Sequence, residues 1–383
     1  WKIKSINDGL FPVIASDPKI EEYFNILKNK KNFYATFDPY AYSKADVIIV
    51  DINLDVQKET KFNGDLINYD VDLTNFKKAI KSISVNCKED FLLLVETTVP
   101  PGTCKKVIKP IIEKGLRSRN LSSDMFKLGH SYERVMPGPD YVDSIQNFYR
   151  VYSGINLKSA DSTEHFLKTI ISTKKYPLTR LQNTNSTELS KVLENSYRAM
   201  NIAFITEWSR FAEESEVNLY EVVDAIRMRP THSNLMYPGI GVGGYCLTKD
   251  PLLASWAKQQ HFGSNQALVQ SEKGVKINDK MPLFAFEFMK NIFDLDNLNY
   301  KNILFLGVSY RSNVGDTRYS PVEKLYNFCK NDGANITLHD PYVSIWEELN
   351  LKVNSKLSSV LSMKIDILII STSHDEYKTS SFF

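Results

Sequence analysis

Short apolar runs along the chain predict the buried strands of parallel sheets. The first clear run covers residues 45–50 and the second covers residues 91–95, which are followed by a polar turn and a helix with apolar residues at 107, 108, 111 and 112. Strand, turn and helix in this order are typical of the βα unit, whose ligands bind at the carboxyl ends of the strands. Thr97 and Thr98 lie at such an end, where they either cap the helix or contact a ligand.

The longest helical pattern runs from about residue 186 to about residue 214. Residues 185–188, Asn-Ser-Thr-Glu, predict a capping box at its start. A polar face recurs at spacings of three and four, and comprises Glu188, Lys191, Asn195 and Arg198. Most amphipathic helices have a solvated polar face, so this spacing by itself does not establish a site. The predicted core stripe comprises Leu189, Val192, Leu193, Ser196, Met200 and Ala203.

Further helices and a second α/β unit complete the predicted elements. Helices are expected near residues 160–171 and 219–228, and two more before about residue 291. Residues 294–301 resemble a linker. Strands are then expected at 302–307, 335–339 and 366–370, with a helix over about 321–331.

A glycine-rich stretch between the helices contains the most reactive candidate side chain. Residues 239–244 include four glycines, whose backbone can approach a ligand closely and offer bare N–H groups. Cys246 follows directly, and Lys249 and Asp250 come where a new helix is expected. A thiol at a helix N-terminus beside a lysine is favoured as the thiolate, which is a nucleophile. The alternative is a glycine-rich turn with a small buried cysteine.

Composition and charge narrow the class of protein. A chain of 383 residues with 43% hydrophobic and 24% charged residues is typical of a soluble protein of two or three domains. The net charge of +2 and the lack of a basic run do not indicate nucleic-acid binding. No apolar run approaches the roughly 20 residues that span a bilayer. The four cysteines are widely spaced, which indicates neither a disulfide framework nor a metal site and favours a cytoplasmic protein.

Five segments, taken together and in order, resemble the UDP-glucose/GDP-mannose dehydrogenase family over nearly the whole chain. This family comprises NAD-dependent nucleotide-sugar 6-dehydrogenases. Any one segment could match by chance, whereas the ordered set is highly specific. The segments are ETTVPPG (96–102), YERVMPG (132–138), ELSKVLEN (188–195), GVGGYCLTKD (241–250) and LGVSYRSNVGDTR (306–318).

The resemblance implies an α/β fold with two Rossmann-like domains, joined by a central helical domain with a long helix. Residues 1–180 would form the NAD-binding domain, residues 181–296 the central dimerisation domain with the cysteine loop, and residues 297–383 the UDP-binding domain. It also implies a homodimer or higher homo-oligomer and a role in making polysaccharide precursors.

The implied reaction is oxidation of the C6 alcohol of a UDP-sugar to a carboxylate, with two NAD molecules reduced in succession. Cys246 would hold C6 as a thiohemiacetal and then a thioester, which retains the aldehyde between the two hydride transfers. Lys191 and Asn195, one helical turn apart, would stabilise the C6 oxyanion. Asp250 would orient or activate a proton donor or water, and Glu133 would help to manage the hydrolytic water.

The resemblance also implies the binding residues. Arg311 would contact the diphosphate, for which a guanidinium is well suited. NAD would be contacted by Thr98, Glu133, Lys249 and Arg318. The UDP-sugar would be contacted by Glu133, Arg134, Val135, Lys191, Asn195, Arg198, Tyr237, Gly241, Gly243 and Arg311.

Several departures from the family pattern modify these expectations. The family begins with a strand and a Gly-x-Gly-x-x-Gly turn, which this chain lacks, so we expect about 50 further residues before Trp1 in the full protein. Residues 50–55 replace a common Val-Pro-Thr-Pro stretch, and Arg311 stands where lysine is common. Glu133-Arg134, followed by Pro137-Gly138, favours the branch that acts on UDP-N-acetylhexosamines such as UDP-GlcNAc or UDP-ManNAc.

Three alternatives remain open from the sequence. The first is a UDP-glucose 6-dehydrogenase. The second is a two-electron hydroxyacid dehydrogenase, which Cys246 and the C-terminal α/β unit argue against. The third is a non-catalytic nucleotide-sugar-binding homologue, for which the thiol would be unnecessary.

Overall fold

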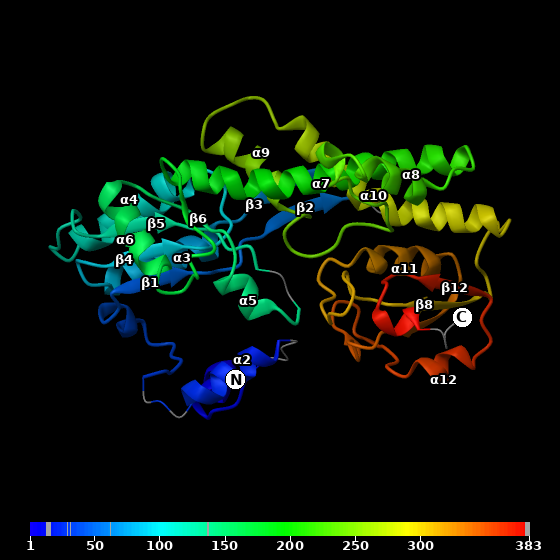
Figure 1. Ribbon diagram of the computed structural model, residues 1–383, viewed down its shortest axis with the longest axis horizontal. Coiled ribbons are helices and arrows are strands. Elements are labelled where there is room, and N and C mark those ends of the chain that lie inside the picture. Colours follow the sequence, from blue (N-terminus) through cyan, green and yellow to red (C-terminus); the bar gives the residue numbers. More distant parts are fainter. Residues whose placement is uncertain (13–16, 29, 31, 62, 136–137, 380–383) are drawn as a thin grey trace. The chain divides into compact units, whose positions relative to one another are not determined.

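The chain folds into two compact units. The computed structural model describes residues 1–12, 17–28, 30, 32–61, 63–135 and 138–379. Unit 1 comprises Trp1–Asp55, Val71–Val192 and Trp256–Gln266, and unit 2 comprises Val56–Asp70, Leu193–Ser255 and Ala267–Phe383. The division falls within the long helix α7 (Thr184–Glu214) and within α9 (Asp250–Gln260) (Figure 1).

Unit 1 is built on a five-stranded sheet of order β1-β4-β5-β6-β7. β1, β4 and β5 are parallel, β6 is antiparallel to β5, and β7 is parallel to β6. Leu93, Leu94 and Val95 of β4 are fully buried, as expected of a strand that is covered on both faces. Both strands predicted in this part of the chain are confirmed. The strands are β1 (Val47–Val50), β4 (Leu92–Val95), β5 (Lys127–His130), β6 (Val151–Gly154) and β7 (Thr179–Arg180).

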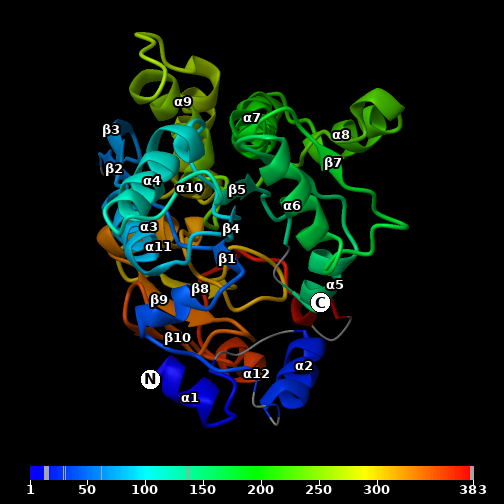
Figure 2. The ribbon, with the colours of Figure 1, turned by 90° about the vertical axis from the view of Figure 1, so that its left-hand side faces the viewer.

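Helices cover both faces of this sheet. Figure 2 shows α3 and α4 on one face and α6 on the other. Gly115 allows α3 and α4 to pack closely, because a Cβ at this position would lie 2.3 Å from the Ser84 hydroxyl oxygen. The helical elements of unit 1 are α1 (Lys2–Asn7), α2 (Pro18–Lys28), a 3₁₀ turn (Pro39–Ser43), α3 (Thr74–Asn86), a π-helical turn (Cys104–Ile108), α4 (Lys109–Arg117), α5 (Tyr141–Gln146) and α6 (Leu157–Leu167).

The start of α7 differs from the predicted capping box. The helix begins at Thr184, and the Asn183 carboxamide oxygen accepts a hydrogen bond from the Ser186 amide at 3.1 Å, which makes Asn183 the N-cap. The Glu188 carboxylate accepts hydrogen bonds from the amides of Gly102 and Cys104 instead of capping α7. The predicted capping box is therefore wrong, because a tertiary contact uses its glutamate.

The predicted core stripe of α7 is partly wrong. Val192, Ser196 and Ala203 are buried, but Leu189 is 50% exposed and Leu193 is 62% exposed. On the polar face, Glu188, Lys191 and Asn195 are buried, whereas Arg198 is exposed. Polar tertiary partners, rather than apolar packing, decide which face of this helix is inside.

The helices of unit 2 pack along the second part of α7. The Asn278 amide of α10 donates to the Ala199 carbonyl of α7 at 2.9 Å. Lys58 of the β2–β3 hairpin forms a 2.8 Å ion pair with Asp279 of α10. The predicted helix at 219–228 and the two helices after it are confirmed. These elements are β2 (Val56–Thr60), β3 (Leu66–Val71), α8 (Leu219–Arg227), a 3₁₀ turn (Pro230–His232) and α10 (Val269–Ile292).

The C-terminal part of unit 2 is a second parallel sheet of order β12-β8-β9. Alternate residues of β8 serve opposite faces: Ile303 and Phe305 pack with α11, and Leu304 and Leu306 pack with α12 and Tyr377. The predicted second α/β unit is confirmed. Its elements are β8 (Asn302–Leu306), α11 (Pro321–Asn331), β9 (Asn335–His339), β10 (Ile345–Trp346), β11 (Leu351–Lys352), α12 (Leu357–Leu361), β12 (Ile367–Ile370) and a 3₁₀ turn (Asp375–Lys378).

The observed fold class is α/β, with two parallel-sheet parts and a helical part that contains the long helix α7, as predicted. Among the helices of the described ranges, none combines the length and the apolarity that crossing a membrane requires.

Candidate active site

Cys246 is the exposed member of the four cysteines, and Cys87, Cys104 and Cys329 are buried. It lies one turn before α9, and its carbonyl accepts a hydrogen bond from the Asp250 amide at 2.9 Å. The predicted helix start near Lys249 is confirmed. An exposed thiol in this position is available to a reactant, unlike a thiol in the core.

The glycines before Cys246 permit close packing within unit 2. A Cβ at Gly243 would lie 2.4 Å from the Tyr310 Cβ, and a Cβ at Gly241 would lie 2.3 Å from the Pro321 Cβ. Gly241 also has a φ of +153°. The backbone before the thiol therefore packs against the loop after β8 and the start of α11. Substrate contact by Gly241 and Gly243 stays a prediction.

A buried polar network joins α7 to the start of α9. The Asn195 amide donates to Asp250 Oδ2 at 2.6 Å, and Lys249 Nζ donates to Asp250 Oδ1 at 2.7 Å. Asp250 is fully buried, and Asn195 and Lys249 are 5% and 4% exposed. Because each carboxylate oxygen has its own donor, the network fixes the orientation of the Asn195 amide.

Arg318 and Tyr310 both interact electrostatically with Cys246. Hydrogen bonds to Asp316 raise the pKa of Arg318, and the charges of Tyr310 and Cys246 raise it further. Burial raises the pKa of Tyr310, and the negative charges of Asp316 and Cys246 raise it further. Tyr310 was missed from the sequence, although it lies beside Arg311 in one of the matched segments.

The loop that bears Tyr310 and Arg311 is held by two fully buried side chains. Asp340 Oδ2 accepts hydrogen bonds from the amides of Val308 at 2.9 Å and Ser309 at 3.2 Å. His374 Nδ1 accepts from the Asn313 amide at 2.9 Å, and its Nε2 lies 3.1 Å from Asp340 Oδ2. Bonds from His374 and from backbone amides hold the pKa of Asp340 below its usual value despite burial. Sequence reasoning missed both residues because they come from separate strand ends.

Unit 1 brings together Lys191 and Glu133. Lys191 Nζ donates to the Glu133 carbonyl at 2.8 Å and lies 3.8 Å from its Oε1. The Val135 amide donates to the Glu133 carboxylate, and Arg134 Nη1 donates to the Tyr149 carbonyl at 2.9 Å. The nearby Pro137 lies outside the described residues.

Acidic side chains gather at the carboxyl ends of β1 and β4. Burial raises the pKa of Glu96, which forms a 3.2 Å ion pair with Arg150. Burial and the charge of Glu133 raise the pKa of Asp51. Asp51 lies in the stretch that departs from the family pattern, so its place beside Glu133 was not expected.

The two threonines after β4 have different surroundings. Thr97 Oγ1 accepts a hydrogen bond from the Ile52 amide at 2.8 Å and is buried, so it links two strand ends rather than capping a helix. Thr98 is half-buried. Of the two sequence interpretations, capping is thus wrong for Thr97.

Glu188 anchors the loop after β4. Its two carboxylate oxygens accept from the Gly102 amide at 2.6 Å and from the Cys104 amide at 2.7 Å. Burial raises the pKa of Glu188 to about 7, although these amides act in the opposite direction. The sequence offered no signal for this role other than the place of Glu188 one turn before Lys191.

Two residues that were predicted to contact the substrate, Arg198 and Tyr237, lie at the surfaces of helices. Arg198 is exposed on α7. The Tyr237 hydroxyl donates to the Asp224 carboxylate, and the ring stacks on Tyr220 with centroids 5.8 Å apart. The structure therefore places Tyr237 against α8, and its contact with substrate stays a prediction.

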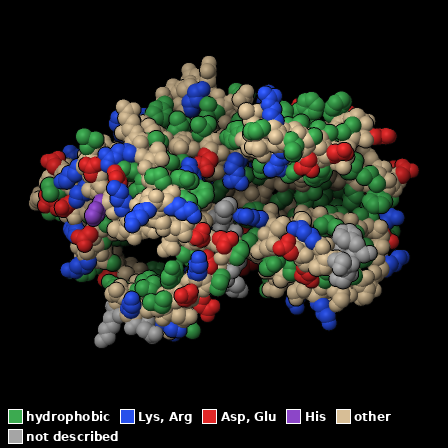
Figure 3. Space-filling view, in the orientation of Figure 1, with side chains coloured by type: hydrophobic (Ala, Val, Ile, Leu, Met, Phe, Trp, Pro, Cys, Tyr) green, Lys and Arg blue, Asp and Glu red, His purple; other side chains and the backbone are tan. Residues whose placement is uncertain are grey.

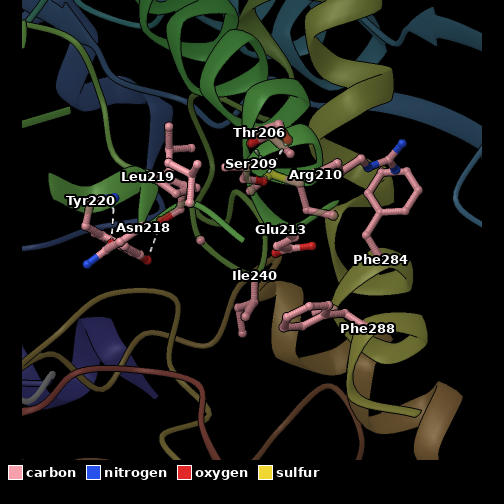
Figure 4. Close-up of a pocket in the computed structure, with 16 residues that line it drawn as sticks. Thr206, Ser209, Arg210, Glu213, Asn218, Leu219, Tyr220, Ile240, Phe284 and Phe288 are labelled. Carbon is pink, nitrogen blue, oxygen red and sulfur yellow. Dashed lines mark hydrogen bonds between the residues drawn. The ribbon is translucent and has the colours of Figure 1, made fainter. Parts of the chain in front are cut away.

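Unit 2 also contains a cavity of about 390 Å³. It is lined by α7, α10, residues 217–220 and residues 238–240. Figure 4 shows Arg210 beside Phe284 on one side of it, with Ile240 and Phe288 below. None of the predicted site residues lines this cavity.

Comparison with known proteins shows three matching models of one family. The NAD binding domain of the UDP-glucose/GDP-mannose dehydrogenase family matches residues 1–171, its central domain matches residues 185–280, and its UDP binding domain matches residues 304–382.

Individual relatives agree with these matches. A UDP-N-acetyl-D-mannosamine dehydrogenase of Methanocaldococcus jannaschii is 33% identical over 308 residues, which cover 80% of this chain and 65% of the relative. That of Pyrococcus horikoshii is 28% identical over 381 residues, covering 98% and 82%. The solved P. horikoshii UDP-D-ManNAc dehydrogenase has a TM-score of 0.81 at 25% identity, covering 98% of this chain and 82% of that one.

This chain thus spans about two thirds of the length of the M. jannaschii relative. The three domain models, in the same order as the two parallel-sheet parts and the helical part between them, together account for nearly all of its residues. The chain belongs to the UDP-glucose/GDP-mannose dehydrogenase family.

Proposed function

We propose that this protein is an NAD-dependent dehydrogenase that oxidises the C6 alcohol of a UDP-N-acetylhexosamine to the uronic acid. The observation that carries the proposal is the exposed Cys246 thiol. It lies one turn before Asp250, whose carboxylate accepts a hydrogen bond from the Asn195 amide. Binding alone would not require an exposed thiol beside a buried carboxylate network. The names of the relatives support an N-acetylated sugar, such as UDP-ManNAc.

NAD fits the residues of unit 1. The carboxyl ends of β1, β4 and β5 are where a parallel sheet binds a dinucleotide, and they bear Asp51, Thr98 and Glu133. The buried Ser131 hydroxyl, just after β5, has no hydrogen-bond partner among the described residues. Thr98, Glu133, Lys249 and Arg318 would contact the dinucleotide. When bound, it supplies the hydride acceptor for C6.

The protein's own residues would retain and stabilise the reacting carbon. Cys246 Sγ adds to the C6 aldehyde to give a thiohemiacetal, and loss of a second hydride gives the thioester. The Lys191 ammonium and the Asn195 amide stabilise the negative charge that develops on the C6 oxygen. Water then adds to the thioester, releases the carboxylate and returns the Cys246 thiol, with Asp250 and Glu133 orienting that water.

The remaining contacts would bind the nucleotide. Arg311 suits the diphosphate because its guanidinium can donate two parallel hydrogen bonds. Arg134, Val135, Arg198 and Tyr237 are proposed to contact the sugar or nucleotide, together with Gly241 and Gly243.

The test is NADH formation by the full-length protein with UDP-ManNAc, UDP-GlcNAc, UDP-GalNAc and UDP-glucose. We expect about two NADH per molecule of one N-acetylated sugar, because the aldehyde is retained between the two oxidations. Cys246→Ser should abolish turnover, and Cys329→Ser, at a buried cysteine far along the chain, should not. One NADH per sugar would indicate a two-electron dehydrogenase. Binding without NADH would indicate a non-catalytic homologue, and turnover of UDP-glucose alone would exclude the N-acetylhexosamine branch.

We further propose a dimer that forms through the apolar outer side of α7 and α8. Large apolar side chains are exposed there, including Leu193, Trp208, Phe211 and Ile226. Figure 3 shows hydrophobic side chains gathered over α8 and α10. An apolar surface of this kind in a protein without a membrane-spanning helix among its described residues favours burial against a second copy.

The domain limits of residues 1–180, 181–296 and 297–383 are also part of this proposal, supported by the three family matches. We propose a cytoplasmic location, supported by the wide spacing of the four cysteines along the chain, which does not indicate a disulfide framework. We also propose a role in the synthesis of polysaccharide precursors.

A further inference from the structure

Tyr132 contacts two of the cations to which the proposed function gives roles. Its side chain is 1% exposed and follows β5 by two residues. The Lys191 ammonium lies 5.4 Å from the centroid of its ring, and the guanidinium carbon of Arg134 lies 5.2 Å from it. One buried ring therefore attracts both cations.

The hydroxyl of Tyr132 adds a second set of contacts. It accepts a hydrogen bond from Arg134 Nη2 at 3.1 Å and lies 2.8 Å from the Ser190 hydroxyl. Ser190 is the residue before Lys191 on α7. The hydroxyl thus ties Arg134 to the helix that bears Lys191, while the Tyr149 carbonyl holds the other nitrogen of the guanidinium.

The ring acts on a lysine that is already restrained. The Glu133 carbonyl accepts a 2.8 Å hydrogen bond from Lys191 Nζ. This bond and the ring face together hold the ammonium in one position. A cation that stabilises a transient oxyanion must be preorganised in this way, because reorganisation during the reaction would cost rate.

We propose that Tyr132 is a positioning residue whose ring fixes Lys191 for the chemical step and whose hydroxyl fixes Arg134 for binding of the UDP-sugar. The inference rests on the proposed function, because it uses the roles given there to both cations. The inference therefore predicts that the ring affects kcat and that the hydroxyl affects KM.

Two substitutions separate these parts in the full-length protein. Tyr132→Phe keeps the ring, so we expect kcat to stay unchanged while KM for the UDP-sugar rises about fivefold. Tyr132→Leu removes the ring as well, so kcat should also fall about tenfold or more. Recovery of kcat by phenylalanine is a readout that a merely structural role would not give.

A matched control exists in the same unit. Tyr152 is also buried, its ring lies 5.5 Å from the Arg180 guanidinium carbon, and its hydroxyl accepts from Arg180 Nε at 2.9 Å. Tyr152→Phe should leave both kinetic constants unchanged. Equal losses in Tyr132→Phe and Tyr132→Leu, or no change in either, would overturn the inference.

Calorimetric affinity for the UDP-sugar distinguishes failure of this inference from failure of the proposed function. If the wild-type protein binds a UDP-sugar without forming NADH, the proposed catalysis fails. Weaker binding by Tyr132→Phe would then still support the Arg134 contact, and unchanged binding would overturn it. If Tyr132→Leu does not fold, a fall of kcat in Tyr132→Phe, or an unchanged KM, would still overturn the inference, because this variant keeps the ring and removes only the hydroxyl.

Discussion

At the scale of single residues, Glu188 makes the stability of the protein depend on pH. Its pKa is about 7 in the folded protein, against an ordinary value of 4.5. The folded state therefore binds this proton more tightly than the unfolded chain does, and the free energy of unfolding should fall as the pH rises through this range. The protonated Glu188 contributes on the order of 3 kcal/mol to the free energy of unfolding below about pH 4.5, and this contribution is lost as the pH rises through about 7.

Denaturant unfolding of Glu188→Gln at several pH values tests this. The variant is neutral at every pH, so the part of the wild-type slope between about pH 4.5 and 7 that comes from Glu188 should disappear. Its carboxamide can accept from only one of the two amides, so it should be less stable at acid pH. Glu207→Gln, at an exposed position on the same helix, is the control. A slope unchanged in Glu188→Gln would contradict the assigned protonation.

A second residue-scale prediction concerns the glycines before Cys246. Gly243→Ala should lower the free energy of unfolding by about 1–3 kcal/mol, because its Cβ would overlap Tyr310. It should also reduce NADH formation by displacing the backbone before the thiol. Gly239→Ala, where no atom of a described residue other than its chain neighbours lies within 4 Å of the added Cβ, should be within about 0.5 kcal/mol of wild type. Equal free energies of unfolding for Gly243→Ala and Gly239→Ala would contradict the predicted overlap with Tyr310.

At the scale of elements, the conformation of the loop after β8 depends on two side chains, Asp340 just after β9 and His374 after β12. His374→Ala removes the acceptor for the Asn313 amide and one partner of the Asp340 carboxylate. We expect the affinity for UDP to fall about tenfold, because Arg311 is no longer held by a fixed loop. Calorimetry with UDP measures this directly.

His339→Ala is the matched control for His374→Ala. His339 is also fully buried in the same sheet, and its Nδ1 lies 2.8 Å from the Tyr377 hydroxyl. Both variants should be less stable by roughly 2–4 kcal/mol. Only His374→Ala should bind UDP more weakly, and equal UDP affinity in the two variants would argue against a role for His374 in holding the loop.

At the scale of the whole molecule, the exposed apolar side of α7 and α8 predicts the oligomeric state. Phe211 is 60% exposed on α7, and Phe211→Glu should convert the proposed dimer to a monomer, because a buried unpaired charge opposes association. Light scattering after gel filtration measures the mass. Phe37→Glu, at a side chain of unit 1 that is 87% exposed, should leave the mass unchanged. A wild-type monomer would rule out the dimer.

The sequence by itself determined the most strongly patterned elements and their order. Continuous apolar runs such as residues 91–95 specify strands that are covered on both faces, and such runs need no tertiary information to be recognised. The long helix, the second α/β unit and the family were all evident from local patterns. These features depend on periodicity and on motif order, which are properties of the chain alone.

Only the tertiary structure decided how the polar residues are used. Glu188 was assigned to a helix cap from its spacing, but it anchors a loop more than 80 residues earlier. Leu189 and Leu193 were expected inside, yet the buried face of α7 carries Lys191 and Asn195. The physical reason is that a buried charge or amide is stable only where partners from other segments satisfy it, and no local pattern in the sequence states which segments those are.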